Sequence, residues 1–309
     1  MNTNMEFDFY DASTLKSYNL DKTIQYQLSL LDTLDVYTRK HCENVANITC
    51  RLCEYLHCSK TFTVYCTICA YLHDLGKVFV PASILQKNGP LTDEEYEIMK
   101  KHTTNGYNMC MKDLALRPYA AGPLYHHEAL NGTGYPNKLH TKQIPLEGQI
   151  IRVADEFDAL VSKRQYKSHI NISDALKIII ENCSPLDSKS KVAYERLGKN
   201  NPHIVKKLFK VVLEDINYEI YCVEGYVSSL QSNIKRLEHI KSYEEMYKKA
   251  KSEKQKNKYL DWMKSMFNQG ETVENYKNVL SDYENAFSYR KKILDDLKNE
   301  CKKVKKLKV

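Results

Sequence analysis

The stretch YLHDLGKVFVPASILQKNGPLTDEEYEIMKKH, residues 71–102, combines helical signals with the first chemically distinctive side chains of the chain. Thr92 and Glu95 have the spacing of a capping box, which predicts a helix that begins there and runs to about residue 106. His73 and Asp74 follow an apolar helical segment. Neighbouring residues on a helix point about 100° apart, so this pair could serve two adjacent metal ions, although the dipeptide alone identifies no site.

Helical periodicity continues on both sides of this stretch. Apolar residues recur at steps of three and four over residues 30–56, and His41 lies inside that apolar stripe. No segment shows the strict alternation of a half-buried strand, so we expect an all-α fold. Further helices are expected over residues 61–75, 118–130 and 148–162, after a cap at Ser173 and Asp174, and from Pro202 onward.

The C-terminal third of the chain reads differently from the middle. Beyond Pro202 there is no further proline, and apolar residues between Ile220 and Leu237 step alternately by three and four. This seam of under three heptads indicates either a helix packed on its own chain or a dimeric coiled coil. Gly270 would be the turn of a helical hairpin. We expect an N-terminal segment 1–27, a catalytic domain 28–213 and a charged helical extension 214–309.

Composition excludes several classes of protein. The chain has 309 residues, 42% of them hydrophobic and 28% charged, with a mean hydropathy of −0.56 and no apolar stretch long enough to span a bilayer. We therefore expect a cytoplasmic protein without a membrane span or a signal peptide. Of the net charge of +7, residues 290–309 supply nine basic and three acidic side chains. Such a tail argues against DNA recognition and reads as a solvated face, with membrane-surface or RNA contact as the alternative.

Two cysteine pairs have zinc-like spacing. Cys50 and Cys53 form one C-x-x-C pair, and Cys66 and Cys69 form the other. Both pairs lie in helix-like sequence without the glycine-bearing turns of a zinc knuckle. We interpret these cysteines, like the others of the ten, as buried free thiols.

The histidines and aspartates point to chemistry once they are taken together. Five imidazoles and two carboxylates form a mixed nitrogen and oxygen donor set that suits first-row metals such as Fe, Mn or Zn. Seven ligands exceed the four of a tetrahedral zinc ion. They fit two metals about 3.5–4 Å apart that share a carboxylate, an arrangement that hydrolyses phosphate esters. The candidates are His41, His73, Asp74, His102, His126, His127 and Asp155.

Several motifs, in this order, resemble those of the HD-GYP subgroup of HD-domain phosphohydrolases. They are YTRKH (37–41), the stretch 71–102 quoted above, HHEALNGTGYP (126–136), IPLEGQIIRVADEFDAL (144–160) and RQYK (164–167). The resemblance covers about residues 30–213. It implies an all-α HD-type domain that hydrolyses cyclic di-GMP, a bacterial second messenger.

The resemblance also implies a division of the ligands. His41, His73, Asp74 and Asp155 would surround one metal, and His102, His126 and His127 would hold the second, with Asp74 bridging. Only a carboxylate has two oxygens able to face two cations. Tyr37 stands where some relatives have a glutamate that binds a third metal, so we expect two divalent ions. Iron or manganese is expected first, with zinc, nickel or cobalt as alternatives.

Substrate contacts are implied in the same way. Lys77 matches the lysine near the scissile phosphate, and Tyr135, Arg164 and Lys167 match positions that hold the ligand's phosphates. Gly134, Tyr135 and Pro136 form the signature tripeptide. Asn131 and Lys163 depart from aspartates that are usual in the subgroup.

A metal-activated hydroxide would attack the phosphodiester in line, while Lys77 and Arg164 offset charge on its oxygens. Asp158, at i+3 from Asp155, would support the ligands or be an ordinary helix carboxylate.

Three alternatives stay open. The same site could act on another cyclic dinucleotide or nucleotide phosphoester, or the protein could be an adaptor that binds a cyclic dinucleotide without cleaving it. Residues 214–309 could form a homodimer or recruit a partner helix.

Overall fold

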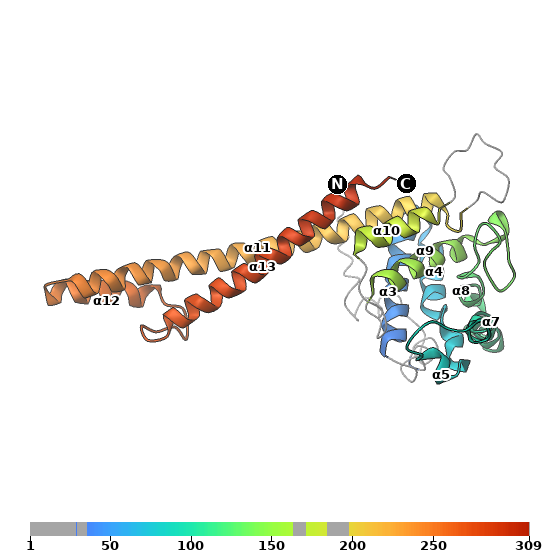
Figure 1. Ribbon diagram of the computed structural model, residues 1–309, viewed down its shortest axis with the longest axis horizontal. Coiled ribbons are helices and arrows are strands. Elements are labelled where there is room, and N and C mark those ends of the chain that lie inside the picture. The colour runs from blue at the N-terminus through green and yellow to red at the C-terminus, as the bar shows by residue number, and fades with distance from the viewer. Residues whose placement is uncertain (1–28, 30–35, 163–170, 184–197, 309) are drawn as a thin grey trace. The chain divides into compact units, whose positions relative to one another are not determined.

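In the computed structural model, residue 29 and residues 36–162, 171–183 and 198–308 are described. This part of the chain is built of helices, with only two isolated β-bridges, so the all-α prediction is confirmed. The chain forms two compact units. One contains the described residues up to Val212 and those from Lys306 on, and the other is Leu213–Lys305. Each unit is coloured by position along the chain in Figure 1.

The N-terminal unit is a cluster of short and medium helices. Apolar residues of α3, α4 and α7 form one of its cores, which includes Cys42, Leu72 and Cys110. Helix α9 packs against α3, α4 and α8. The elements are α3 (Val36–Tyr55), α4 (Lys60–Leu72), η1 (Leu75–Phe79), α5 (Ala82–Leu85), α6 (Asp93–Lys100), α7 (His102–Lys112), η2 (Arg117–Tyr119), α8 (Ala121–Tyr125), η3 (Thr141–Gln143), α9 (Leu146–Val161), α10 (Ile172–Glu181) and the start of α11 (Pro202–Lys249).

The helix expected from Thr92 to about residue 106 is two helices. The capping box of Thr92 and Glu95 is present and starts α6. The backbone then tightens at Lys101, whose N–H donates to the carbonyl of Ile98, and α7 begins at the next residue. This break places His102 at the start of a helix.

Two other sequence predictions were wrong in detail. The helix expected over 118–130 ends at Tyr125. There the side chain of His126 faces the last carbonyl groups of the helix, and its Nδ1 lies 3.0 Å from the carbonyl oxygens of both Gly122 and Pro123. The cap expected at Ser173 and Asp174 lies earlier. Asn171 precedes the helix and its carbonyl accepts the first backbone hydrogen bonds, so Ser173 is buried in the first turn of α10.

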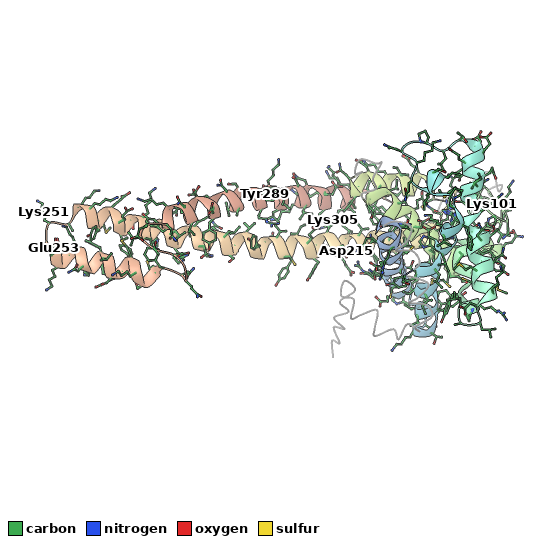
Figure 2. The ribbon with its side chains drawn as sticks, turned by 90° about the horizontal axis from the view of Figure 1, so that it is seen from below. Lys101, Asp215, Lys251, Glu253, Tyr289 and Lys305 are labelled. Atoms are coloured by element: carbon green, nitrogen blue, oxygen red, sulfur yellow. The ribbon has the colours of Figure 1, made fainter. Side chains whose placement is uncertain are left out.

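The C-terminal unit is a long helical hairpin. It comprises the rest of α11, then α12 (Glu253–Met266) and most of α13 (Tyr276–Lys306). Figure 2 shows Lys251 and Glu253 together at one end, where α11 gives way to α12. In both figures α13 runs back along α11. A core of Leu237, Ile240, Met263, Tyr276 and Leu280 joins the three helices.

The C-terminal half of the heptad seam of α11 faces its own chain within this hairpin. Leu230 and Leu237 are buried, and Ile234 packs against the core that α12 and α13 complete. Gly270, with φ +86°, lies between α12 and α13, as expected for a hairpin turn. The earlier turn after α11 carries neither glycine nor proline and was not predicted. A homodimer or partner helix through residues 214–309 stays a prediction. Among the described helices, none is both long and apolar enough to cross a membrane.

Candidate metal centre

All seven predicted ligands belong to the N-terminal unit, and the structure brings them together. They come from five places in the chain. His41 lies on α3, His73 and Asp74 lie between α4 and η1, His102 begins α7, His126 and His127 follow α8, and Asp155 lies on α9.

One group of ligand atoms surrounds Asp155. His41 Nε2 lies 3.0 Å from Asp155 Oδ1, and His73 Nε2 lies 3.9 Å from the same oxygen. Asp74 Oδ2 is 3.7 Å from His41 Nε2 and 3.3 Å from His73 Nε2. The donor atoms of His41, His73 and Asp155 all lie within 4.8 Å of one another. This spacing could hold one metal ion, with Asp74 Oδ2 as a fourth donor.

A second group lies on the other side of the Asp74 carboxylate. His102 Nε2 and His126 Nε2 are 3.2 Å apart, and together with His127 they again offer three donor atoms within 4.8 Å of one another. Asp74 Oδ1 lies 3.5 Å from His102 Nε2 and 4.0 Å from His126 Nε2. The two oxygens of Asp74 therefore face different histidine groups, which is the geometry a bridging carboxylate requires.

Backbone carbonyls fix the orientation of three of these imidazoles. His73 Nδ1 lies 2.7 Å from the carbonyl oxygen of Ala70, and His102 Nδ1 lies 2.7 Å from that of Met99. His126 Nδ1 faces two carbonyls at the end of α8. Because a carbonyl only accepts, Nδ1 carries the proton in each neutral ring and the lone pair of Nε2 points into the centre.

A carboxylate does the same for His41. Its Nδ1 lies 2.6 Å from Asp158 Oδ2, and Asp158 Oδ1 accepts hydrogen bonds from Asn44 Nδ2 at 2.9 Å and from Ser162 Oγ at 2.7 Å. Asp158 is buried. Oδ2 thus orients His41, and the two hydrogen bonds to Oδ1 fix the Asp158 carboxylate itself.

The arrangement fits a cation between these groups. His73 Nε2 is buried and has no hydrogen-bond partner. Its lone pair faces the oxygens of Asp74 and Asp155, and acceptors aimed at one another repel unless a positive charge lies between them. The donor set contains imidazole and carboxylate, as first-row divalent metals prefer.

Burial and charge set the protonation of the ligands. Burial raises the pKa of the Asp74 carboxyl, but the charge of Lys77 and the interactions with His73 outweigh burial, so the pKa falls well below its usual range. Burial lowers the pKa of His127 to about 3 and lowers that of His102 as well. Burial also lowers the pKa of His41, but its hydrogen bonds to Asp155 and Asp158 prevail and raise it to about 9. A metal ion at His41 would therefore compete with a proton.

Two glycines allow the backbones around the site to approach closely. A Cβ on Gly76 would lie 1.9 Å from the carbonyl oxygen of His102, so η1 can touch the start of α7 only because residue 76 has no side chain. A Cβ on Gly134 would lie 2.3 Å from the N of Ala129. Because residue 134 has no side chain, the loop that contains Gly134, Tyr135 and Pro136 can pack on the residues that follow His127. The Tyr135 N–H donates to the His127 carbonyl at 3.2 Å.

The predicted substrate residues lie beside the ligands where the structure describes them. Lys77 Nζ donates to Asp74 Oδ2, and the ring of Tyr135 stacks on that of His127 with 4.6 Å between centroids. Pro136 follows and is half-buried. Arg164 and Lys167 fall outside the described residues, as do Lys163 and the side chain of Tyr37.

Asn131, which replaces a usual aspartate, still organises its loop. Its Oδ1 accepts hydrogen bonds from the N–H and the hydroxyl of Thr133, at 3.1 and 2.7 Å. An amide oxygen accepts as a carboxylate does, so this turn keeps its hydrogen bonds without the charge.

Sequence reasoning missed three residues at the site. The Cys42 thiol lies within 4.8 Å of donor atoms of His73 and Asp74, and burial raises its pKa, so it stays protonated. Its position directly after His41 on a buried helix was the available signal. Tyr96 and Lys100 of α6 lie near Tyr135, and their only signal in the sequence was the i, i+4 spacing between them. The cysteines with zinc-like spacing are buried and form no disulfide among the described residues, and none of them joins a possible metal group there.

Comparison with known proteins places the chain in a family. The family model described as HD domain matches residues 18–189, which is more than half of the chain. The chain belongs to the HD-domain family. The motifs quoted above, together with the relatives that follow, assign it to the HD-GYP subgroup, as the sequence predicted.

Three relatives illustrate the similarity. A cyclic di-GMP phosphodiesterase of Thermotoga maritima is 37% identical over 198 residues, 57% of this chain and 54% of the relative. The cyclic di-GMP phosphodiesterase response regulator RpfG of Xanthomonas campestris is 42% identical over 105 residues, 33% of this chain and 28% of the relative. The 3'3'-cGAMP-specific phosphodiesterase 2 of Vibrio cholerae is 33% identical over 168 residues, 54% of this chain and 31% of the relative. The chain thus spans about half the length of the first relative and less than a third of the other two.

Proposed function

We propose that this chain is a metal-dependent phosphodiesterase that hydrolyses cyclic di-GMP in the bacterial cytosol. The observation that carries the proposal is the position of the Asp74 carboxylate, with Oδ2 3.3 Å from His73 Nε2 and Oδ1 3.5 Å from His102 Nε2. Two relatives are named cyclic di-GMP phosphodiesterases, which favours this substrate.

The proposed centre contains two divalent cations. His41, His73 and Asp155 would hold one, His102, His126 and His127 the other, and Asp74 would bridge them. We propose iron or manganese, with zinc, nickel or cobalt as alternatives, because the donors mix imidazole and carboxylate. When bound, such a pair neutralises phosphate oxygens and lowers the pKa of a bound water towards neutrality.

The chain's own residues would prepare the reaction. Lys77, whose Nζ now donates to Asp74, lies where it could stabilise negative charge on a phosphate oxygen. Tyr135 is half-buried against His127, so its ring and hydroxyl would fix one side of the ligand. Arg164 and Lys167 are proposed as further phosphate contacts on the basis of their motif. The backbone carbonyls of Ala70 and Met99 would keep the imidazoles of His73 and His102 aimed at the centre while the substrate turns over.

A second candidate substrate is a cyclic GMP–AMP dinucleotide. It shares the phosphodiester chemistry, and one relative is named as specific for 3'3'-cGAMP. The metal ligands contact no base, so they favour neither substrate. The choice depends on residues that surround the bases.

The test is a hydrolysis assay on protein purified without oxygen and loaded with Mn²⁺ or Fe²⁺. We expect cleavage of cyclic di-GMP, with kcat/KM compared across cyclic di-GMP, 3'3'-cGAMP and cyclic di-AMP. A preference for 3'3'-cGAMP would replace the first substrate with the second. Metal-loaded protein that binds cyclic di-GMP but cleaves no cyclic dinucleotide would contradict the enzymatic proposal and favour a binding adaptor.

A further inference from the structure

Helix α6 holds an aromatic side chain at the edge of the site without a packing reason. The helix is fixed at its start by the Thr92–Glu95 capping box, and Lys87 Nζ lies 2.5 Å from Glu95 Oε2. None of its residues is buried. Tyr96 is 46% exposed, so the apolar core does not account for a large ring at this position.

Tyr96 continues a row of rings that starts at a proposed metal ligand. The Tyr135 ring stacks on the His127 ring, with centroids 4.6 Å apart and planes 25° apart. The Tyr96 ring stands edge-on to the Tyr135 ring, with centroids 6.3 Å apart and planes 82° apart. Tyr96 thus lies one ring further from the metal centre than Tyr135.

A cation belongs to the same row. Lys100 Nζ lies 5.3 Å from the centroid of the Tyr96 ring and 5.9 Å from that of the Tyr135 ring. Its side chain is 25% exposed, and its Nζ is 2.5 Å from Glu97 Oε1, whose side chain is 67% exposed. An exposed ion pair contributes little stability, so an anion could take the place of Glu97 on Lys100 at little cost.

We propose that Tyr96 and Lys100 bind the half of a cyclic dinucleotide that is not being cleaved. Tyr96 would stack on a purine, and Lys100 would pair with the second phosphate. The inference rests on the proposed function and adds a substrate subsite to it. A cyclic dinucleotide carries two purines and two phosphodiesters, so one base and one phosphate extend away from the reacting bond. Stacking on an aromatic ring accepts any base, which predicts that this subsite tolerates guanine and adenine alike.

The alternative is that Tyr96 and Lys100 form an ordinary i, i+4 pair on a helix surface. Substrates of different size distinguish the proposed subsite from such a surface pair. Methyl p-nitrophenyl phosphate has one phosphodiester and no purine, so it reaches the metal centre without reaching Tyr96. A role confined to folding or to the metals would change the hydrolysis of both substrates equally.

The experiment compares Tyr96→Ala, Tyr96→Phe, Lys100→Gln and Lys100→Arg in the metal-loaded full chain. Tyr221→Ala, at a 74% exposed tyrosine of α11, is the matched control. Tyr96→Ala removes one base stack and should raise the KM for cyclic di-GMP about tenfold. The kcat for cyclic di-GMP and the hydrolysis of methyl p-nitrophenyl phosphate should be unchanged. Tyr96→Phe keeps a ring and should stay within about twofold of wild type. Lys100→Gln should raise KM about fivefold and reduce its salt dependence, and Lys100→Arg should restore both.

The inference is overturned if Tyr96→Ala leaves the KM for cyclic di-GMP unchanged, or if it affects the small diester equally. Calorimetric titration of cyclic di-GMP separates this failure from failure of the proposed function. Wild-type protein that binds cyclic di-GMP without cleaving it would contradict the function, while an equal Kd for wild type and Tyr96→Ala would contradict the subsite. Absence of any binding to wild type would contradict both.

Discussion

Asp74 and His102 meet at the centre of the site, with Asp74 Oδ1 3.5 Å from His102 Nε2. They come from different elements, and the contact exists because Gly76 lets η1 lie against the start of α7. The opposite oxygen of Asp74 faces His73 and His41. One carboxylate therefore connects two groups of histidines, and the proposed chemistry depends on that connection.

Replacing Asp74 with alanine should abolish activity and remove metal. Mutation of a residue that only hydrogen-bonds a metal ligand already lowers metal affinity or activity about 10- to 100-fold. Loss of a bridging ligand should therefore lower both by at least about 100-fold. The measurements are metal content per chain by elemental analysis and cyclic di-GMP turnover. Asp282→Ala, at an exposed position of α13, is the control and should retain both. Normal metal content in Asp74→Ala would rule out a bridge.

Asp158→Asn should weaken metal binding, although Asp158 is not itself a proposed metal ligand. Oδ1 of Asp158 accepts from two donors, and Oδ2 faces the N–H of His41, so an amide nitrogen in either orientation would oppose a donor. We expect metal affinity to fall about 10- to 100-fold. Titration with Mn²⁺ against a competing chelator measures this, with Asp282→Asn as the control. An unchanged affinity would show that Asp158 does not position His41.

Gly76→Ala should destabilise the N-terminal unit. Its Cβ would lie 1.9 Å from a backbone oxygen that cannot move away freely, and overpacking of this kind costs about 1–3 kcal/mol. Gly225→Ala is the matched control, because a Cβ there meets nothing within 4 Å and residue 225 lies inside α11. That control should be stabilising by about 0.5–1 kcal/mol. Denaturant unfolding followed by circular dichroism gives both values, and equal effects of the two substitutions would contradict the packing argument.

The stability of the C-terminal unit should depend on pH through Glu244. Hydrogen bonds from Lys248, Tyr276 and Lys277 lower the pKa of Glu244 from 4.5 to about 2. A carboxyl with a lowered pKa in the folded state stabilises it fully above its unfolded pKa and loses that contribution as pH falls towards the folded one. The effect should therefore be complete at pH 7 and disappear between about pH 5 and pH 2.

Trp262 reports this transition selectively, because it is the single tryptophan and lies on α12. At pH 7, Glu244→Gln should unfold about 4–8 °C below wild type by tryptophan fluorescence, the shift that about 1 kcal/mol produces in a unit of this size. Near pH 2 the two proteins should unfold together. A difference that persists at low pH would assign the effect to packing rather than to charge.

The sequence predicted those parts of the molecule that depend on residue type and order. The all-α class followed from periodicity, and seven residues from five separate places in the chain were expected to meet before any geometry was known. The break at Lys101 was not predictable, because Thr92 to residue 106 has no proline or clear cap inside it. The first turn of the hairpin, after Lys249, was missed for the same reason, since it uses neither glycine nor proline.

Contacts that depend on three-dimensional placement were also out of reach. Tyr96 is one of 23 tyrosines, and only the structure shows its ring beside that of Tyr135. Asp158 had the right helix spacing from Asp155, but its hydrogen bond to His41 joins residues 117 positions apart. Arg164 and Lys167 stay predictions, since they fall outside the described residues.

The most direct test of the central claim is an anomalous-diffraction map of crystals grown from Mn²⁺-loaded protein. The account predicts two peaks about 3.5–4 Å apart, one between Asp74 and the His41–His73–Asp155 group and one between Asp74 and the three other histidines. A single peak, or peaks that leave either group of histidines without a metal, would contradict it.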